Sequence, residues 1–404
     1  MDADKTLARF LELAAIPGLS GDEQAVAEYL VRVFKEAGVP DSQIQFDAAE
    51  TRTNLKGNCG NLIVTLPGNG KGAESRSGQE SGSGPRTMLS AHMDTVPICV
   101  GSQPVVDGDQ VRSSAATGLG ADDRSGCAAI LTAALERLKL GDEKFPPAVI
   151  GFFVQEEIGL HGARNLDVSL VGNVDRAFNF DGGAPEKVTI GAVGGERITI
   201  KVFGTPAHAG VAPQQGASAI VMASKAIADL DQRGWLGKIE KDGRSGTANV
   251  GVIQGGDATN VVTPLVTLRA EARSHDAEMR TRIVAEIRQA FQAAAESVST
   301  ESGVCGKIEF QTQVDYEAFR LGEDHPSIQA ANDAISKVGR TPYCDVANGG
   351  LDANWLYRHG VEAVTLGCGQ RNIHTIDERL EIADYLDACR IATWLITEGA
   401  ESAG

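Results

Sequence analysis

The segment Ile150-Gly-Phe-Phe-Val-Gln-Glu-Glu-Ile-Gly159 changes abruptly from apolar to acidic. Its apolar residues up to Val154, bounded by glycine, are typical of a buried β-strand. Two adjacent carboxylates, Glu156 and Glu157, follow directly. Because successive strand side chains point to opposite faces, the two glutamates can have different roles. Ligands bind beyond the carboxyl ends of strands in open α/β sheets, which is where this pair lies. Two solvated glutamates in a loop would be the better interpretation of the pair alone, but other ligand types at the ends of other strand-like runs overturn it.

The composition is that of a globular protein with two domains. The 404 residues exceed the size at which a single hydrophobic core stops growing. The formal net charge of −17 argues against non-specific binding to nucleic acid or to an anionic membrane. No run approaches the roughly 20 apolar residues of a membrane span.

The compartment is expected to be the cytoplasm. The first residues, Met-Asp-Ala-Asp-Lys, lack the basic and apolar regions of a signal peptide. The seven cysteines are odd in number and scattered, with no C-x-x-C pair. Reduced thiols are the simplest explanation of this pattern.

Hydrophobic periodicity predicts an α/β domain interrupted by a second module. Ser20 with Glu23 forms a capping-box pattern before a helix, and residues 67–86 are a Gly/Ser-rich surface excursion. From Glu196 the predicted order is β-α-β-β-α-β, a ferredoxin-like arrangement. The sequence therefore predicts a first part of the host domain, an inserted module and a second part of the host domain, over residues 1–195, 196–316 and 317–404.

Four further motifs carry metal-binding side chains. They are His92-Met-Asp94, Asp122-Asp123 before a predicted helix, Asp181-Gly-Gly183 and the segment from Gly369 to His374. Each alone has a common structural explanation as a surface turn, a helix cap or a structural histidine. Together, two histidines and several carboxylates at strand ends suit two divalent ions, Zn²⁺ with Mn²⁺ or Co²⁺ as alternatives. A shared aspartate would bridge such a pair.

Seven motifs span nearly the whole chain in the order AHMDTVP, GLGADDRSG, FFVQEEIG, NFDGG, GTPAHAG, GGLDAN and NIHTIDE. With them the sequence resembles the M20 family of dinuclear zinc peptidases and amidohydrolases, most closely its peptidase T (tripeptide aminopeptidase) branch. Arg124 and Ser125 depart from the commoner Lys-Gly or Lys-Ala, a mild departure. The resemblance implies a zinc-exopeptidase-like catalytic domain with a mixed sheet, and makes the inserted module a lid that carries a homodimer contact.

The resemblance also implies a ligand set for two metal ions. One ion would be held by His92 and Asp181. The other would be held by Glu157 and His374. Asp122 would bridge the two.

The remaining roles concern the reaction and the substrate. The resemblance makes Asp94 the carboxylate that orients His92, and Glu156 the general base for a water between the two metals. In the lid, His208 would polarise the scissile carbonyl. The residues that it implies for substrate binding are Asn260 and Arg273, with Gly349 and Gly350 lining the pocket.

The favoured function is a metal-dependent exopeptidase for short peptides, a tripeptide aminopeptidase in particular. A carboxypeptidase, a dipeptidase or an N-acyl amino acid deacylase stays open, because the metal core is common to all of these. A non-catalytic metal- or peptide-binding protein is the alternative from a different class. Retention of Glu156 beside a complete ligand set argues against that class.

Overall fold

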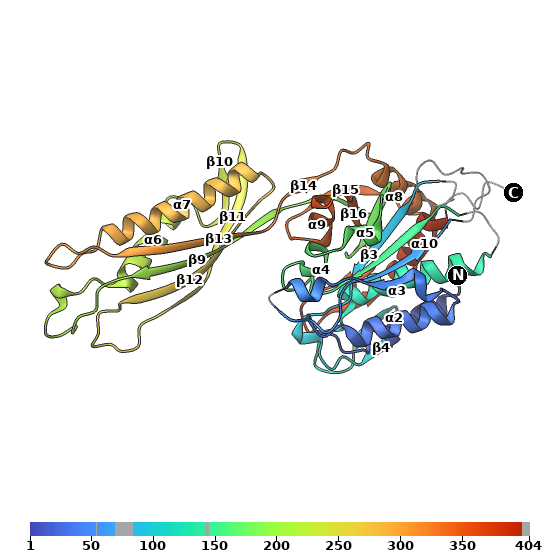
Figure 1. Cartoon of the computed structure of the whole chain (residues 1–404), viewed down its shortest axis with the longest axis horizontal. Helices are drawn as coiled ribbons and strands as arrows, with labels where there is room; N and C mark the ends of the chain where they lie inside the picture. Colours follow the sequence, from blue (N-terminus) through green and yellow to red (C-terminus); the bar gives the residue numbers. More distant parts are fainter. Residues whose placement is uncertain (54, 69–83, 142–144, 398–404) are drawn as a thin grey trace. The chain divides into compact units, whose positions relative to one another are not determined.

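The computed structural model describes residues 1–53, 55–68, 84–141 and 145–397. Most of the Gly/Ser-rich segment expected at 67–86 therefore lies outside the described residues. Contacts divide the chain into two compact units (Figure 1). Unit 1 comprises Met1–Gly191, Arg320–Ala347 and Leu351–Gly404, and unit 2 comprises Ala192–Phe319 and Asn348–Gly350.

A mixed sheet of nine strands forms the centre of unit 1. Its middle strands β6, β3, β7 and β16 lie side by side and run parallel to one another. In spatial order the sheet contains β1 (Ile44–Phe46), β2 (Leu62–Leu66), β6 (Ala148–Phe153), β3 (Thr87–His92), β7 (Arg176–Phe180), β16 (Ala363–Leu366), β8 (Lys187–Ala192) and β14 (Phe319–Arg320), with β15 (Tyr343–Ala347) paired to β8.

Helices and a small second sheet complete unit 1. The helices are α1 (Ala3–Ala14), α2 (Gln24–Glu36), α3 (Ala121–Lys139), α4 (His161–Arg164), α5 (Val168–Val171), α8 (Pro326–Lys337), α9 (Asp352–Arg358) and α10 (Ile382–Thr397). The small sheet has the order β17 (Gln370–Arg371), β18 (Arg379–Glu381), β5 (Gln110–Ser113) and β4 (Pro104–Asp107). Short 3₁₀ helices are η1 (Asp41–Gln43), η2 (Ala49–Arg52), η3 (Pro97–Cys99) and, in unit 2, η4 (Pro213–Gln215).

The core of unit 1 surrounds β3, β6, β7 and α3. All residues of the three strands are buried, as expected for parallel strands covered on both faces. Helix α3 is rich in alanine, and its one glycine, Gly126, faces the sheet, so the helix can lie close to it. At Gly126 an added Cβ would meet the carbonyl oxygen of Phe180 at 2.0 Å. This close approach brings the start of α3 to the end of β7.

Unit 2 is one antiparallel sheet packed against two helices. The sheet has the order β10 (Gly237–Lys241), β11 (Arg244–Gly255), β12 (Leu265–Ser274), β9 (Gly194–Phe203) and β13 (Lys307–Tyr316), and the helices are α6 (Ala219–Gln232) and α7 (Ala277–Glu296). Buried Ile198, Ile200 and Val202 alternate with more exposed residues along β9. This alternation is that of a sheet with one face on the core.

The predicted β-α-β-β-α-β order holds for six elements of unit 2, and β10 is an additional strand. It forms a hairpin with β11 through Asp242 and Gly243, which both have positive φ. Asp-Gly is a preferred pair for such a turn, so the signal for β10 was present in the sequence. The dimer contact expected on this unit stays a prediction.

The capping box predicted at Ser20 and Glu23 is wrong. Helix α2 begins at Gln24 without a side-chain cap. Glu23 accepts a hydrogen bond from the Gly21 amide, at 2.8 Å. The Ser20 hydroxyl instead donates to Asp94 at 2.6 Å.

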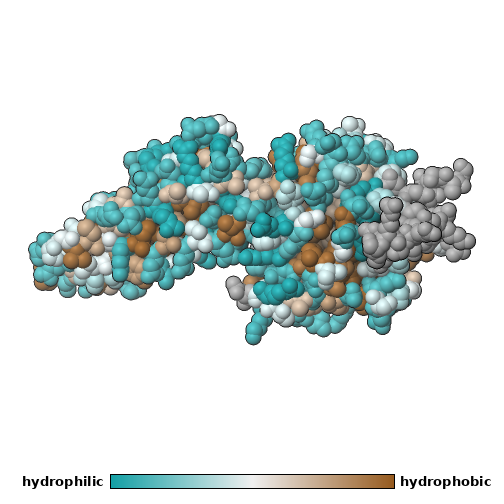
Figure 2. Space-filling view, turned by 45° about the horizontal axis from the view of Figure 1, so that its top comes forward, coloured by the Kyte–Doolittle hydropathy of each residue, from teal (hydrophilic) through white to brown (hydrophobic). Residues whose placement is uncertain are grey.

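The surface of the protein is largely polar on the face that Figure 2 shows. The face drawn in Figure 2 is mostly hydrophilic on both units, with small hydrophobic patches. Among the described helices, none combines the length and the apolar character needed to cross a membrane. All seven cysteines are unpaired.

Candidate metal centre

The parallel strands of unit 1 bring four of the sequence motifs to one edge of the sheet. His92 is the last residue of β3. Glu156 and Glu157 follow β6, and Asp181 directly follows β7. His374 lies in the segment after β16 and β17. Because β6, β3, β7 and β16 are parallel neighbours, their carboxyl ends meet at the same edge.

Asp122 lies between the two histidines. Its Oδ1 is 3.2 Å from Nε2 of His92, and its Oδ2 is 3.2 Å from Nε2 of His374. His374 Nε2 is also 3.0 Å from Oε1 of Glu157. The backbone of Asp122 is not helical although the residue lies in the first turn of α3. One carboxylate thus faces both imidazoles, which is the arrangement that a bridging ligand needs.

Two groups of side chains could each hold one ion. The ligand atoms of His92, Asp122 and Asp181 all lie within 4.8 Å of one another. The same holds for the ligand atoms of Asp122, Glu157 and His374. Asp122 is common to both groups, so the structure brings together all five residues that the resemblance implied as ligands.

Asp94 contacts both His92 and the turn that carries Glu156 and Glu157. Its carboxylate is completely buried, and Oδ1 is 3.3 Å from Nδ1 of His92. The backbone amides of Glu156 and Glu157 donate to its two oxygens at 3.0 and 3.2 Å. With the Ser20 hydroxyl as a further donor, Asp94 fixes the turn that carries both glutamates.

Burial and charge shift the pKa values of this group in opposite directions. Burial, with the nearby Asp122 charge, raises the pKa of Asp181 to about 7. Burial also raises the pKa of Glu156 well above its usual range. Burial opposes the ionisation of Asp122, but its hydrogen bonds to His374 and His92 outweigh this and lower its pKa. The same hydrogen bond to Asp122, then that to Glu157, raises the pKa of His374 to about 10.

These residues fit a pair of divalent ions. Imidazole nitrogens with carboxylate oxygens are the donor set of Zn²⁺, and Mn²⁺ and Co²⁺ accept similar sets. Several buried carboxyl groups lie close together here, and the charge of each opposes the ionisation of the others. Bound cations would offset this repulsion. One ion would be held by His92, Asp122 and Asp181, and the other by Asp122, Glu157 and His374.

Glu378, which was not predicted from the sequence, holds the loop of Asp122. Its side chain is buried, with 2% of the residue exposed. Its two oxygens accept hydrogen bonds from the backbone amides of Gly120, at 2.7 Å, and Asp122, at 3.0 Å. Glu378 follows His374 by one short turn. The segment that carries the candidate ligand His374 therefore also positions the candidate ligand Asp122. The acid is part of the NIHTIDE motif, but nothing in the sequence pairs it with residues 120–122.

Replacing Glu378 with glutamine is expected to weaken metal binding by roughly 10- to 100-fold, the usual cost of losing a group that orients a ligand. Glutamine would turn an NH₂ group toward one of the two amide donors, and the Asp122 loop would shift. Metal affinity measured by competition with a chelator tests this without reference to activity. Glu362→Gln is the matched control, because Glu362 is exposed and pairs with His325. Equal affinities of wild type and Glu378→Gln would exclude the positioning role.

The predicted substrate-binding residues all belong to unit 2. His208 is exposed, and its Nδ1 accepts hydrogen bonds from the amides of Gly210 and Val211 at 3.2 Å. The Ala209 amide donates to the Asn260 carbonyl at 2.9 Å, which joins the two loops. The structure thus brings His208 and Asn260 together.

Arg273, Gly349 and Gly350 also lie in unit 2, where their neighbours differ from those of His208 and Asn260. The Arg273 guanidinium forms a two-point ion pair with Glu271, at 3.1 and 3.0 Å. A Cβ on Gly350 would lie 2.5 Å from the Tyr316 ring, whereas Gly349 has open space. The roles of these residues in substrate binding stay predictions.

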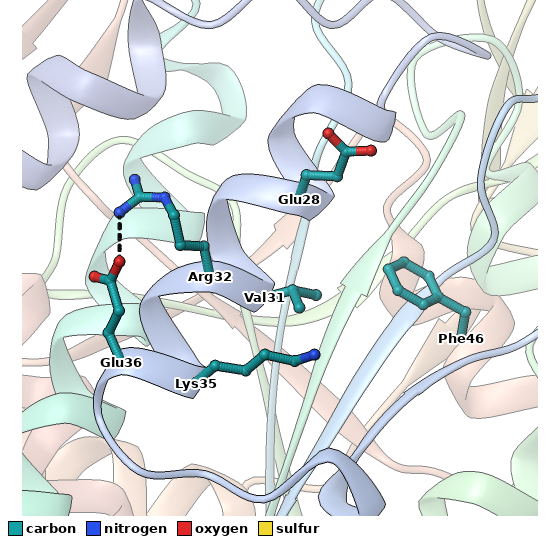
Figure 3. Close-up of a pocket in the computed structure, with 6 residues that line it drawn as sticks. All are labelled: Glu28, Val31, Arg32, Lys35, Glu36 and Phe46. Atoms are coloured by element: carbon teal, nitrogen blue, oxygen red, sulfur yellow. Dashed lines mark hydrogen bonds and ion pairs between the residues drawn. The ribbon is translucent and has the colours of Figure 1, made fainter.

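A hollow of about 380 Å³ lies beside α2. Figure 3 shows its lining, with the ion pair between Arg32 and Glu36 on α2 and the ring of Phe46 opposite. None of its lining residues belongs to the candidate metal centre. A smaller cavity of about 140 Å³ is lined by Asp181, together with Thr189, Thr365 and Leu351, and therefore adjoins the centre.

Comparison with protein families agrees with this geometry. A model of the Peptidase family M20/M25/M40 matches residues 88–398, more than half of the chain. The chain belongs to this family. It is therefore a metallopeptidase of family M20, and the family implies a peptide substrate. Uncharacterized protein YqjE of Bacillus subtilis is 33% identical over 402 residues, which are 98% of this chain and 99% of that protein.

Two solved structures resemble this M20 peptidase over almost its entire length. Aminopeptidase PepT from Bacillus cereus has a TM-score of 0.83, and a tripeptidase from Staphylococcus aureus has a TM-score of 0.85. Each is 29% identical, and the match covers 98% of both chains. A mixed-sheet catalytic domain with an inserted lid domain, as predicted from the sequence, is confirmed.

A probable carboxypeptidase from Arthroderma otae matches a smaller part of the chain. It is 29% identical over 278 residues, which are 65% of this chain. The match spans only 57% of that carboxypeptidase.

Proposed function

We propose that this M20 peptidase is a metal-dependent aminopeptidase that removes the first residue of short peptides, with tripeptides as the preferred substrates. The observation that carries the proposal is the likeness to an aminopeptidase and a tripeptidase structure over 98% of each chain. The match to the probable carboxypeptidase leaves much of both proteins unaligned. The likeness over the whole chain is stronger evidence than this partial match, because substrate specificity depends on regions outside the common metal centre.

The reaction is a hydrolysis in which Glu156 carries the proton. When bound, two divalent ions acidify water and polarise a carbonyl oxygen. Glu156 takes a proton from the attacking water and delivers it to the leaving amine. Its raised pKa suits this task, because burial makes the carboxyl group a better proton acceptor. The two hydrogen bonds from the glutamate turn to Asp94 keep the base beside the candidate ligand Glu157.

Unit 2 would contribute to substrate binding. His208 on its hydrogen-bonded loop would oppose the negative charge that develops on the carbonyl oxygen. Asn260, which is joined to the same loop through its carbonyl, would bind the peptide backbone. The Arg273 guanidinium is already paired with Glu271, so it would bind a substrate carboxylate only by exchanging that partner.

The favoured activity predicts which end of a peptide is released. A tripeptide with three different residues, such as Leu-Gly-Phe, should give leucine and Gly-Phe. A carboxypeptidase would give phenylalanine and Leu-Gly. We expect the N-acetylated tripeptide to be cleaved at least about 100-fold more slowly, because a site built for a free amine rejects a substrate without it.

Mass spectrometry of the products, with added Zn²⁺, Mn²⁺ or Co²⁺, provides the test. A tetrapeptide and a dipeptide of the same composition serve as length controls. Release of the last residue would replace the aminopeptidase by a carboxypeptidase. Preferential cleavage of the acetylated peptide would replace it by a deacylase.

A further inference from the structure

The carboxylate of Asp352 is buried without a partner. Only 1% of the residue is exposed, and neither of its oxygens has a hydrogen-bond partner among the described residues. Asp352 is the first residue of α9, and Leu351 before it holds the N-cap position. The capping contact there comes from Asn354, whose Oδ1 accepts a hydrogen bond from the Leu351 amide at 2.9 Å. A buried charge without a partner is unfavourable unless a ligand supplies one.

Packing within unit 1 places helix α9 beside segments that carry the candidate metal centre. Helix α9, which begins at Asp352, packs on α4 and on β16. The His359 ring nitrogen lies 3.0 Å from the carbonyl oxygen of Ala163 on α4, the helix that follows the glutamate turn. Leu351, directly before Asp352, lines the same 140 Å³ cavity as Asp181.

Electrostatic interactions agree with this placement. Burial raises the pKa of Asp352 to about 8; the charge of His92 opposes this shift, and the charges of Asp181 and Glu157 add to it. The Asp352 charge also acts on Glu156, the candidate base. Yet Asp352 belongs to neither group of potential metal ligands found among the described residues.

The neighbouring carboxylates are already engaged. Asp94 accepts three hydrogen bonds, from Ser20 and from the amides of the glutamate turn. Asp123 accepts from the backbone amides of His92 and Gly126, at 3.2 and 3.1 Å. Asp181 accepts from Gln370 at 3.1 Å. Asp352 is thus a carboxylate beside the centre that neither holds the structure together nor belongs to a metal-binding group.

We propose that Asp352 binds the α-ammonium group of the peptide substrate. The inference rests on the aminopeptidase function proposed above and names the group that would recognise the free N-terminus. An ammonium group carries one positive charge and three N–H donors, and it would satisfy both unpartnered oxygens. An acetylated N-terminus has no charge and a single N–H, so it would leave the buried carboxylate without compensation.

The Asp352→Asn variant tests this role with a free tripeptide and its N-acetyl form. We expect kcat/KM for the free tripeptide to fall by roughly 100-fold, mostly through KM, because the charge that holds the amine is lost. The slow cleavage of the acetylated peptide should stay unchanged, so the preference for a free N-terminus disappears. Asp333→Asn, at an exposed position on α8, is the matched control and should retain the wild-type preference. Metal content is measured in every variant.

The outcomes separate the two proposals. If wild type prefers the free peptide and Asp352→Asn keeps that preference, Asp352 is not the amine site, and the aminopeptidase function stands. If wild type prefers the acetylated peptide, the aminopeptidase function itself fails. Should Asp352→Asn lose its metal or fold poorly, the wild-type crystal structure with a non-hydrolysable phosphinic tripeptide decides. The expected distance from its amine nitrogen to an Asp352 oxygen is about 2.8 Å, and an amine bound elsewhere overturns the proposal.

Discussion

Replacing Glu156 with glutamine is expected to lower kcat by roughly 10³-fold, a typical contribution of a general base. Glutamine has almost the same shape but cannot accept the proton of the attacking water. The hydrogen bonds from the turn to Asp94 involve backbone amides, so they persist in the variant. Metal content should therefore stay at the wild-type value. Steady-state kinetics and elemental analysis on the same preparation measure the two quantities.

Glu323→Gln is a suitable control for this variant, because Glu323 is exposed and remote in sequence from every motif. It should retain wild-type turnover. Near-normal turnover of Glu156→Gln would remove Glu156 as the base. A loss of metal from this variant would instead assign it to the ligand set.

Replacing Asp122 with alanine is expected to remove both metal ions and all measurable activity. Its two oxygens face His92 and His374 at 3.2 Å each, so one carboxylate serves both candidate sites. Without it, each site retains only two of its three grouped side chains. Elemental analysis should show a fall from about two ions per chain toward zero.

His374→Ala is the informative comparison for Asp122→Ala. His374 belongs to only one of the two groups, and its ring is about half exposed. This variant should therefore lose one ion and keep the other, which His92, Asp122 and Asp181 would hold. Equal metal content in the two variants would contradict a bridging role for Asp122. Unchanged stoichiometry in His374→Ala would remove that histidine from the ligand set.

The fold and the strand-end positions of the candidate ligands could be predicted because their signals are local, whereas the division of roles among these residues came from the resemblance. The strand before Glu156 is an unbroken apolar run, and parallel strands place their carboxyl ends together. His92 and Asp181 follow the same rule. The Asp-Gly pair between β10 and β11 is likewise a local signal, for a hairpin.

The missed features depend on contacts between distant segments. Ser20 and Glu23 match a capping box by spacing, but Ser20 binds Asp94, 74 positions away. Glu378 reaches Asp122 across 256 positions. Asp352 is part of the GGLDAN motif, but no sequence pattern reveals that neither of its oxygens has a partner.

The central claim is that His92, Asp122, Glu157, Asp181 and His374 hold two cations. The most direct test is anomalous diffraction at the zinc edge from crystals of the zinc-loaded protein. The account predicts two strong peaks, one between His92 and Asp181 and one between Glu157 and His374, with an oxygen of Asp122 bound to each. A single peak, or peaks away from these five side chains, would contradict it.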